Sequence, residues 1–292
     1  MISTEKLNKI IELDENERLI TVESGVNTQY LTEFLANKRW RLAQNIGSAM
    51  WSTIGGNVAI RSGSPFSLKY GTTADWVRNL EVVLPTGEIM WTGKQVSKSA
   101  TGLELTHLFC GSEGKLGMIT KVCLEVLPLS KPSFLFFIQT AQETKLISFI
   151  NKLFLTKLEP LAIEFVDVKG MNLLQTYFIE NKITFSEISS KINFQQAAIW
   201  LSFEKEEELG ELYLQLCQQL YEIEIYDTLQ MIELEHQEMF WKIRFAVGKA
   251  VIEKSIFREI DACISRKNIQ EWLDFLSKTA KKYNYQYTAF VS

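Results

Sequence analysis

The chain has 292 residues, of which 46% are hydrophobic and 23% charged, with a formal net charge of −4. These proportions are typical of a globular protein with one large or two ordinary domains, and not of a disordered or fibrous chain. The acidic balance, with an isoelectric point near 5.5 and no basic patch interleaved with aromatic residues, argues against nucleic acid as a partner.

Signals for a membrane, a disulfide framework or a metal are missing from the sequence. The first residues lack the apolar segment of a signal peptide, and no stretch reaches the roughly eighteen apolar residues of a membrane span. The cysteines, Cys110, Cys123, Cys217 and Cys263, are scattered, without a C-x-x-C motif or a nearby pair of histidines. We therefore expect a cytoplasmic protein with no metal site.

Residues 1–130 alternate between apolar and polar in the manner of strands, with turn signals between them. The pattern predicts strands at residues 19–22, 80–84 and 88–92, with a hairpin turn at residues 85–87. One helix is predicted early, capped by Asn27 or Thr28, with Leu31, Phe34 and Leu35 on one face.

Prolines at 128 and 132 separate this part from a second one, residues 131–292. Strands are predicted at residues 134–138, 163–168 and 198–203, and helices around residues 146–153, 209–220 and 269–276. This alternation predicts an α+β layer, an open antiparallel sheet with helices on one face. The acidic run at residues 204–208 is interpreted as the solvated start of a helix and not as a metal site.

Two glycine-rich runs carry the clearest functional signal, T-I-G-G-N-V-A at residues 53–59 and G-S-E-G-K-L-G-M-I-T at residues 111–120. Glycine lets main-chain N–H groups approach a ligand closely, so each run can line an anion or an aromatic ring. The alternative is that each run only forms a tight turn or bulge between strands. Neither run is a P-loop or the G-x-G-x-x-G fingerprint of a Rossmann fold.

Five motifs follow one another in order: V-E-S-G-V from residue 22, N-I-G-S-A-M-W-S-T-I-G-G-N-V from residue 45, K-Y-G from residue 69, L-E-V-V-L-P-T-G-E-I from residue 80 and F-C-G-S-E-G-K-L-G-M-I-T from residue 109. This series resembles the FAD-linked oxidases of the vanillyl-alcohol oxidase superfamily. In particular, it resembles the branch that contains D-lactate dehydrogenase, D-2-hydroxyglutarate dehydrogenase and the related component of glycolate oxidase. The likeness covers most of residues 8–292.

The resemblance implies an α+β fold with two domains. Residues 1–130 would form a PCMH-type FAD-binding domain that lacks its first subdomain. Residues 131–292 would form a substrate (cap) domain with an antiparallel sheet, incomplete at its C-terminal end. The family's P-R-G-x-G-T-G loop would precede Met1, and its G-H-x-G-D-G-N-x-H motif would follow Ser292. On this basis we expect the 292-residue chain to be colourless or partly flavinylated, aggregation-prone and inactive on its own.

FAD is the cofactor that the resemblance implies, and the two glycine-rich runs are expected to converge on a groove that holds it. The predicted FAD-binding residues of the first run and its flanks are Ser48, Thr53, Gly55, Gly56, Asn57, Ile60, Arg61, Ser62 and Gly63. Those of the second run are Glu113, Gly114, Leu116, Gly117 and Ile119. The chain departs from the family pattern at residues 46–47 and 60–62.

A substrate-binding residue is predicted at Arg244, on a helix face shared with Phe240, Trp241 and Val247. From periodicity alone, Arg244 could instead extend to solvent or pair with an acid elsewhere. The family has a W-x-x-R motif here, which Trp241 and Arg244 match, and its arginine binds the substrate carboxylate as a bidentate fork. We expect Arg244 to point toward the FAD groove. Arg258 is the nearest cation where some relatives have a second carboxylate ligand.

The implied activity is that of an FAD-dependent 2-hydroxy acid dehydrogenase, in which hydride passes from the substrate α-carbon to the flavin. No catalytic residue is assigned, because His107 is interpreted as a local hydrogen-bonding residue and His236 as exposed at a helix start. The alternative is a non-catalytic remnant or a piece of a split enzyme with a weakened flavin site. The electron acceptor, a partner subunit and the identity of the acid stay open.

Overall fold

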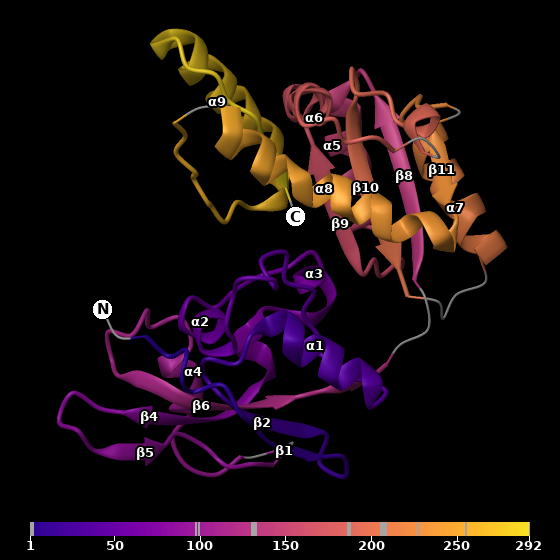
Figure 1. The fold of residues 1–292 in the computed structure, drawn as a ribbon. Helices are drawn as coiled ribbons and strands as arrows, with labels where there is room; N and C mark the ends of the chain where they lie inside the picture. The colour runs from indigo at the N-terminus through magenta and orange to yellow at the C-terminus, as the bar shows by residue number, and fades with distance from the viewer. Residues whose placement is uncertain are drawn as a thin grey trace. The chain divides into compact units, whose positions relative to one another are not determined.

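The computed structural model describes residues 3–96, 98, 100–129, 133–185, 188–204, 209–226, 228–254 and 256–291. The chain divides into two compact units, residues 1–130 and residues 131–292 (Figure 1). The linker prolines at 128–132 and the acidic run at 204–208 lie partly outside the described residues, so the predicted helix start at 205–208 is not described.

The first unit is built on a five-stranded antiparallel sheet with the strand order β1-β2-β6-β4-β5. Its strands are β1 Ile10–Asp14, β2 Leu19–Glu23, β4 Val77–Val83, β5 Ile89–Trp91 and β6 Met118–Glu125. A separate small sheet pairs β3 Trp40–Arg41 with β7 Leu127–Pro128. The predicted hairpin is confirmed, since β4 pairs with β5 and Gly87, at φ 88°, donates its N–H to Leu84 O.

Helices cover one face of this sheet (Figure 1). They are α1 Thr28–Asn37, α2 Ile54–Ala59, α3 Ser67–Tyr70, η1 Thr73–Trp76 and α4 Thr106–Phe109. The predicted cap of α1 is confirmed, because the Asn27 side chain accepts the N–H of Tyr30. Leu31 and Leu35 of α1 are fully buried with Ile54 and Val58 of α2 against alternate residues of the strands, as expected for an amphipathic helix on a sheet.

The second unit has a five-stranded antiparallel sheet with the order β11-β8-β10-β9-β12. Its strands are β8 Phe134–Thr140, β9 Ala162–Val166, β10 Ala197–Phe203, β11 Leu229–Ile232 and β12 Phe290–Val291. The strand predicted at 163–168 ends earlier than expected. Asp167 instead caps the next helix by accepting the N–H of Gly170, a role that aspartate favours.

Helices cover both faces of this second sheet, so the prediction of helices on one face is wrong. The helices are α5 Glu143–Leu153, α6 Val168–Glu180, η2 Ser189–Lys191, α7 Leu209–Tyr221, α8 Leu234–Lys254, η3 Arg266–Asn268 and α9 Ile269–Tyr283. Leu135, Phe137 and Trp200 pack against α6 and α8, whereas Phe136 contacts Tyr213 of α7 on the other face. Consistent with this, every residue of β9 and β10 is buried.

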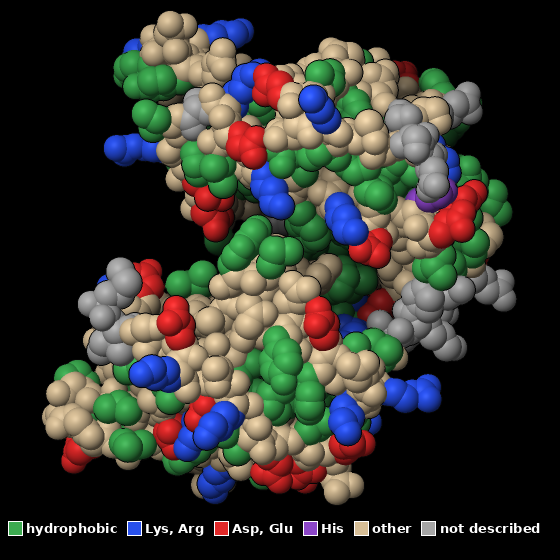
Figure 2. All heavy atoms as spheres, in the orientation of Figure 1, with side chains coloured by type: hydrophobic (Ala, Val, Ile, Leu, Met, Phe, Trp, Pro, Cys, Tyr) green, Lys and Arg blue, Asp and Glu red, His purple; other side chains and the backbone are tan. Residues whose placement is uncertain are grey.

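Two surface properties bear on function. On the face shown in Figure 2, acidic and basic side chains are intermixed over both units. Within the described part of the chain, no helix combines the length and apolar character that a membrane crossing requires.

Candidate functional site

The first glycine-rich run forms the start of α2, where it packs against the end of β2. Thr53 is the N-cap and accepts the N–H of Gly56 at 3.2 Å. Gly55 donates its N–H to Ser24 O at 2.7 Å, and a Cβ on Gly55 would lie 2.5 Å from Ser24 Cβ. The N–H groups of Gly55 and Gly56 therefore already have acceptors, contrary to the expectation that both are exposed to a ligand.

The second glycine-rich run lies directly against the end of α2. Gly111 donates its N–H to Val58 O, and Glu113 donates its N–H to Ala59 O, each at 2.9 Å. A Cβ on Gly111 would lie 3.3 Å from Arg61 Cβ. The two runs therefore meet, as predicted, whereas the groove between them and the cofactor contacts of individual residues stay predictions.

Left-handed backbone marks the junction between the runs. Arg61 has φ 53°, Glu113 φ 54° and Gly114 φ 75°. Arg61 follows the C-cap of α2 in a Schellman arrangement, since Ser62 N–H donates to Asn57 O at 2.9 Å and Arg61 N–H to Val58 O at 3.1 Å. The junction thus holds two charged side chains where glycine is the usual residue.

The predicted cofactor residues fall into three groups by exposure. The exposed ones are Ser48, Gly56, Ile60, Arg61, Gly63, Glu113, Gly114 and Leu116. Gly55, Asn57, Gly117 and Ile119 are buried, and Thr53 and Ser62 are half-buried. Two of the buried members contact other elements of the unit: Asn57 donates to Thr28 Oγ1 of α1 at 2.8 Å, and a Cβ on Gly117 would meet Val82 and Val83 O of β4.

Some of the exposed residues carry hydrogen-bond donors that have no acceptor in the described part of the chain. Among the described residues, the N–H groups of Gly63 and Gly114 have no acceptor, and no atom lies within 4 Å of a Cβ built on Gly114. The Arg61 side chain is fixed by a bond from Nε to Thr72 Oγ1 at 3.3 Å, whereas Nη1 and Nη2 find no acceptor in the described part of the chain. Two amides and one guanidinium are suited to an anionic or carbonyl-bearing ligand.

Two titratable groups near Arg61 have shifted pKa values. Burial raises the pKa of the Cys110 thiol to about 12, which makes it a poor nucleophile. For Asp75, burial acts to raise the pKa, but hydrogen bonds from Thr72 and the nearby Arg61 charge outweigh it and lower the pKa. Asp75 is therefore an anion that holds Thr72, which accepts from Arg61, and not an acid catalyst.

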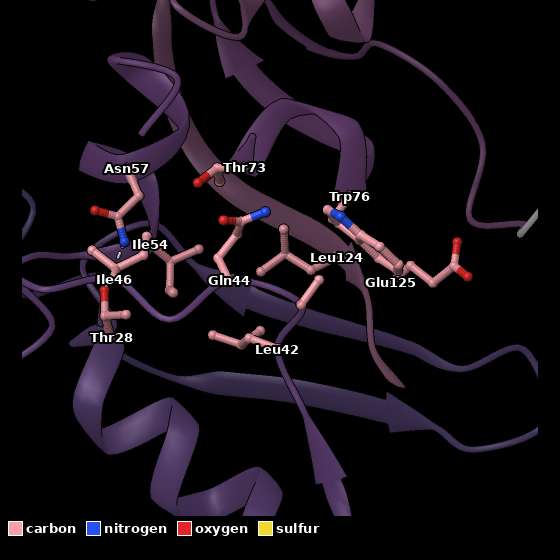
Figure 3. A pocket seen from close by; sticks show the side chains of 11 residues that line it. Thr28, Leu42, Gln44, Ile46, Ile54, Asn57, Thr73, Trp76, Leu124 and Glu125 are labelled. Atoms are coloured by element: carbon pink, nitrogen blue, oxygen red, sulfur yellow. Dashed lines mark hydrogen bonds between the residues drawn. The ribbon is translucent and has the colours of Figure 1, made fainter. Parts of the chain in front are cut away.

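A small cavity of about 20 Å³ lies inside the first unit (Figure 3). Its lining includes the polar residues Thr28, Gln44, Asn57 and Thr73 and the apolar residues Ile54 and Leu124. Such a volume holds about one water molecule. The cavity is therefore too small for a flavin ring.

In the second unit, Arg244 lies in the interface between α8 and the sheet and is 7% exposed. Its Nη2 forms an ion pair with Oε2 of Glu164, a residue of β9 that is 1% exposed. The guanidinium carbon lies 5.0 Å from the ring centre of Phe290 on β12. Burial raises the pKa of the Glu164 carboxyl, and the Arg244 charge opposes this shift. The sequence alone allowed Arg244 to extend to solvent or to pair with an acid, and the structure shows the pairing with an acid.

Glu164 was not predicted from the sequence as a partner of Arg244. The signal that could have found it is a single carboxylate in the otherwise apolar strand A-I-E-F-V, because a buried charge is rare unless it is paired. Arg258, by contrast, is exposed on a stretch without regular secondary structure. Its role as a substrate ligand stays a prediction.

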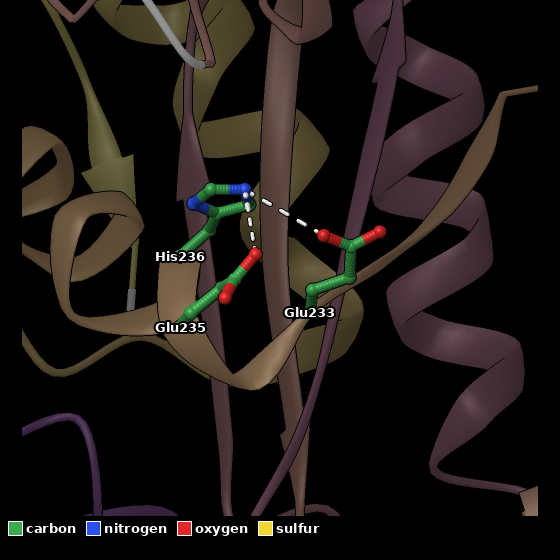
Figure 4. Close-up of side chains that lie close together, drawn as sticks. All are labelled: Glu233, Glu235 and His236. Carbon is green, nitrogen blue, oxygen red and sulfur yellow. Dashed lines mark ion pairs between the residues drawn. The ribbon is translucent and has the colours of Figure 1, made fainter.

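The two histidines do not form a catalytic pair with a nucleophile. His107 Nδ1 lies 3.4 Å from Glu104 Oε1, a local contact as expected. The side chain of His236 is only 15% exposed, so the prediction that it is exposed is wrong. Its Nε2 lies 3.6 Å from Glu233 Oε2 and 3.7 Å from Glu235 Oε1 (Figure 4). Because both carboxylates are exposed, we interpret this cluster as a helix-start ion pair and not as a metal site.

Comparison with known proteins agrees with the interpretation of the first unit. Residues 1–93 match the FAD binding domain family. A D-lactate dehydrogenase of Anaerostipes hadrus is 29% identical over 291 residues, which cover 99% of this chain and 61% of that protein. The glycolate oxidase subunit GlcD of Bacillus subtilis is 35% identical over 176 residues, covering 59% of this chain and 36% of that protein.

Among solved structures, an alkyldihydroxyacetonephosphate synthase aligns with a TM-score of 0.71 at 18% sequence identity, covering 95% of this chain and 55% of that one. This similarity supports the fold, a PCMH-type domain together with mixed helices and antiparallel sheets. The chain spans less than two thirds of the length of each of these three proteins.

FAD is the cofactor that these comparisons indicate, and the donor groups of the junction fit it. The phosphates and the ring carbonyls of a flavin nucleotide accept hydrogen bonds, which the open N–H groups of Gly63 and Gly114 and the Arg61 guanidinium can donate. The open space beside Gly114 allows close approach to its main chain.

Proposed function

We propose that the chain, which is similar to a D-lactate dehydrogenase and to a glycolate oxidase subunit, is a member of the FAD-linked oxidase superfamily and forms part of an FAD-dependent 2-hydroxy acid dehydrogenase. The substrate class is that named for its relatives, such as D-lactate or glycolate. The observation that carries the proposal is the pair of hydrogen bonds from Gly111 and Glu113 to the end of α2. These bonds join two runs that are about fifty residues apart into one surface with open donors.

Each unit has its own part in this proposal. In the first unit, Gly63, Gly114 and Arg61 hold the cofactor, which supplies the redox chemistry when bound. In the second unit, Arg244 binds the carboxylate of the acid, because a guanidinium offers a charge-assisted, bidentate contact. Arg258 is proposed as a further carboxylate ligand.

A cytoplasmic location and a separate electron acceptor or partner subunit are also proposed. The location is supported by the scattered cysteines, which are the pattern of a reducing compartment. The acceptor follows from the reaction class, since a reduced flavin must pass its electrons on.

The cofactor proposal is tested by titrating the full chain with FAD and following flavin fluorescence. Gly114→Ala should weaken FAD binding by about tenfold, because the new Cβ blocks approach to the main chain at the junction. Gly87→Ala is the matched control, since Gly87 also has positive φ, at 88°, and nothing within 4 Å of its Cβ position. An equal effect of the two substitutions would contradict the proposal.

A further inference from the structure

The ion pair between Arg244 and Glu164 is buried but incomplete. Only Nη2 of the guanidinium and Oε2 of the carboxylate are joined. Arg244 Nε and Glu164 Oε1 are buried atoms with no hydrogen-bond partner among the described residues. Leaving such atoms unsatisfied destabilises a fold, and a buried ion pair is itself weak evidence for a stabilising role. The pair therefore calls for an explanation other than stability.

The surroundings fix the two side chains in place. Glu164 faces Trp200 across the strand pair β9–β10, and Trp200 donates its ring N–H to Phe240 O of α8 at 3.0 Å. The ring of Phe137 packs against both Trp200 and Phe240. A carboxylate on such a packed surface cannot move far from the guanidinium, so its charge acts on anything that Arg244 binds.

In its ionised form, Glu164 opposes the local charge of Arg244. A ligand carboxylate that binds Arg244 meets the negative charge of Glu164 at short range. A second carboxylate on the same ligand adds further repulsion, which is strong where water is excluded. The arrangement favours a ligand whose only charge is the bound carboxylate.

We propose that Glu164 is a positioning residue that holds Arg244 and selects 2-hydroxy acids with one carboxylate, such as D-lactate or glycolate, against acids with two, such as D-2-hydroxyglutarate. This inference rests on the proposed role of Arg244. It assigns a specificity role to a residue for which neither motif nor composition gives one.

The test is calorimetric binding of D-lactate and of D-2-hydroxyglutarate to the full chain without FAD, so that no turnover occurs. The unmodified chain should bind D-lactate more tightly. Glu164→Gln keeps an oxygen that accepts from Nη2 and removes the charge, so it should shift the affinity ratio toward the dicarboxylate by about tenfold. Glu164→Asp retains the charge and should show the same affinity ratio as the unmodified chain.

Two control variants separate this inference from the proposed function. Glu143→Gln removes one charge from the same unit at a half-buried residue that accepts the N–H of Val168 at 2.8 Å, and it should leave the ratio unchanged. Arg244→Met should abolish binding of both acids. If the unmodified chain binds neither acid, or Arg244→Met binds both normally, the proposed substrate site fails and the inference fails with it.

The inference fails alone if both acids bind through Arg244 and Glu164→Gln leaves their ratio unchanged. Thermal unfolding of each variant shows whether it is folded. If Glu164→Gln does not fold, the preference of the unmodified chain decides the question, since tighter binding of the dicarboxylate overturns the inference.

Discussion

The two units place their candidate binding groups in opposite environments. In the first unit, whose sheet is covered by helices on one face, the open donors are main-chain N–H groups and one guanidinium at an exposed junction of loops. In the second unit, whose sheet is covered on both faces, the candidate group is a buried guanidinium between α8 and β9. The proposed binding groups of the first unit are therefore different atoms from those that hold its fold, whereas the proposed binding group of the second unit is itself part of a buried ion pair.

The substitution Arg244→Met should have the largest effect of those that test this contrast. It should lower the free energy of unfolding by about 3–5 kcal/mol, because Glu164 is left buried without its partner. Arg244→Met combined with Glu164→Met should recover most of that loss, since two apolar side chains need no partner. Urea denaturation of the single and double variants measures this, and equal losses in both would show that the charges do not interact in the folded state.

In the first unit, two neighbouring glycines should behave differently. Gly55→Ala should destabilise the chain by about 1–3 kcal/mol, because overpacking forces the backbone apart where a Cβ would lie 2.5 Å from Ser24 Cβ. Gly56→Ala should change stability by about 0.5 kcal/mol or less, since its Cβ would meet only Thr53 Oγ1, at 3.1 Å. Thermal unfolding compares them, and equal effects would mean that the close approach of α2 to β2 is not a constraint.

The smallest expected effect is a pH dependence in the second unit. Burial raises the pKa of Asp167, against hydrogen bonds from Thr288 and Gly170 that lower it. A raised pKa in the folded state means that the protonated carboxyl is favoured there. The contribution of the protonated Asp167 carboxyl to the free energy of unfolding is therefore fully present below the unfolded pKa, near 3.8. It is lost as the pH rises through the folded pKa.

Asp167→Asn removes this titration and keeps an N-cap oxygen. The variant should thus gain stability relative to the original chain as the pH rises through that window, by roughly 1 kcal/mol. Denaturation at several pH values measures the difference. A difference that is constant with pH would mean that the pKa of Asp167 is the same in the folded and unfolded states, so that the hydrogen bonds offset burial.

Local patterns were sufficient for much of the fold. The cap at Asn27, the hairpin at residues 85–87 and the leucines of α7 each depend on residues close in sequence, and all three are confirmed. The covering of the second sheet was predicted wrongly, although A-A-I-W-L-S-F in β10 has no polar alternation. Continuous apolar strands are typical of a sheet buried on both faces.

Long-range pairings were beyond the sequence. The convergence of the two glycine-rich runs was predicted only because the motif order resembles a known family. Nothing local connects Glu164 with Arg244, which lies eighty residues later in the chain, and the helix α6 was overlooked because Asp167 was assigned to a strand. The exposed and the buried predicted cofactor residues likewise occur in the same glycine-rich runs and their flanks. Only the three-dimensional structure distinguishes them.

The left-handed backbone at Arg61 and Glu113 has a consequence for protein engineering. A residue with a Cβ in this conformation is destabilising by about 1 kcal/mol relative to glycine, so a sequence optimised for thermostability alone would place glycine at both positions. Such a consensus-style redesign would raise the melting temperature and at the same time remove the only guanidinium found at this junction in the described part of the chain. Stability screens would then reward variants that have lost the guanidinium proposed to bind the cofactor.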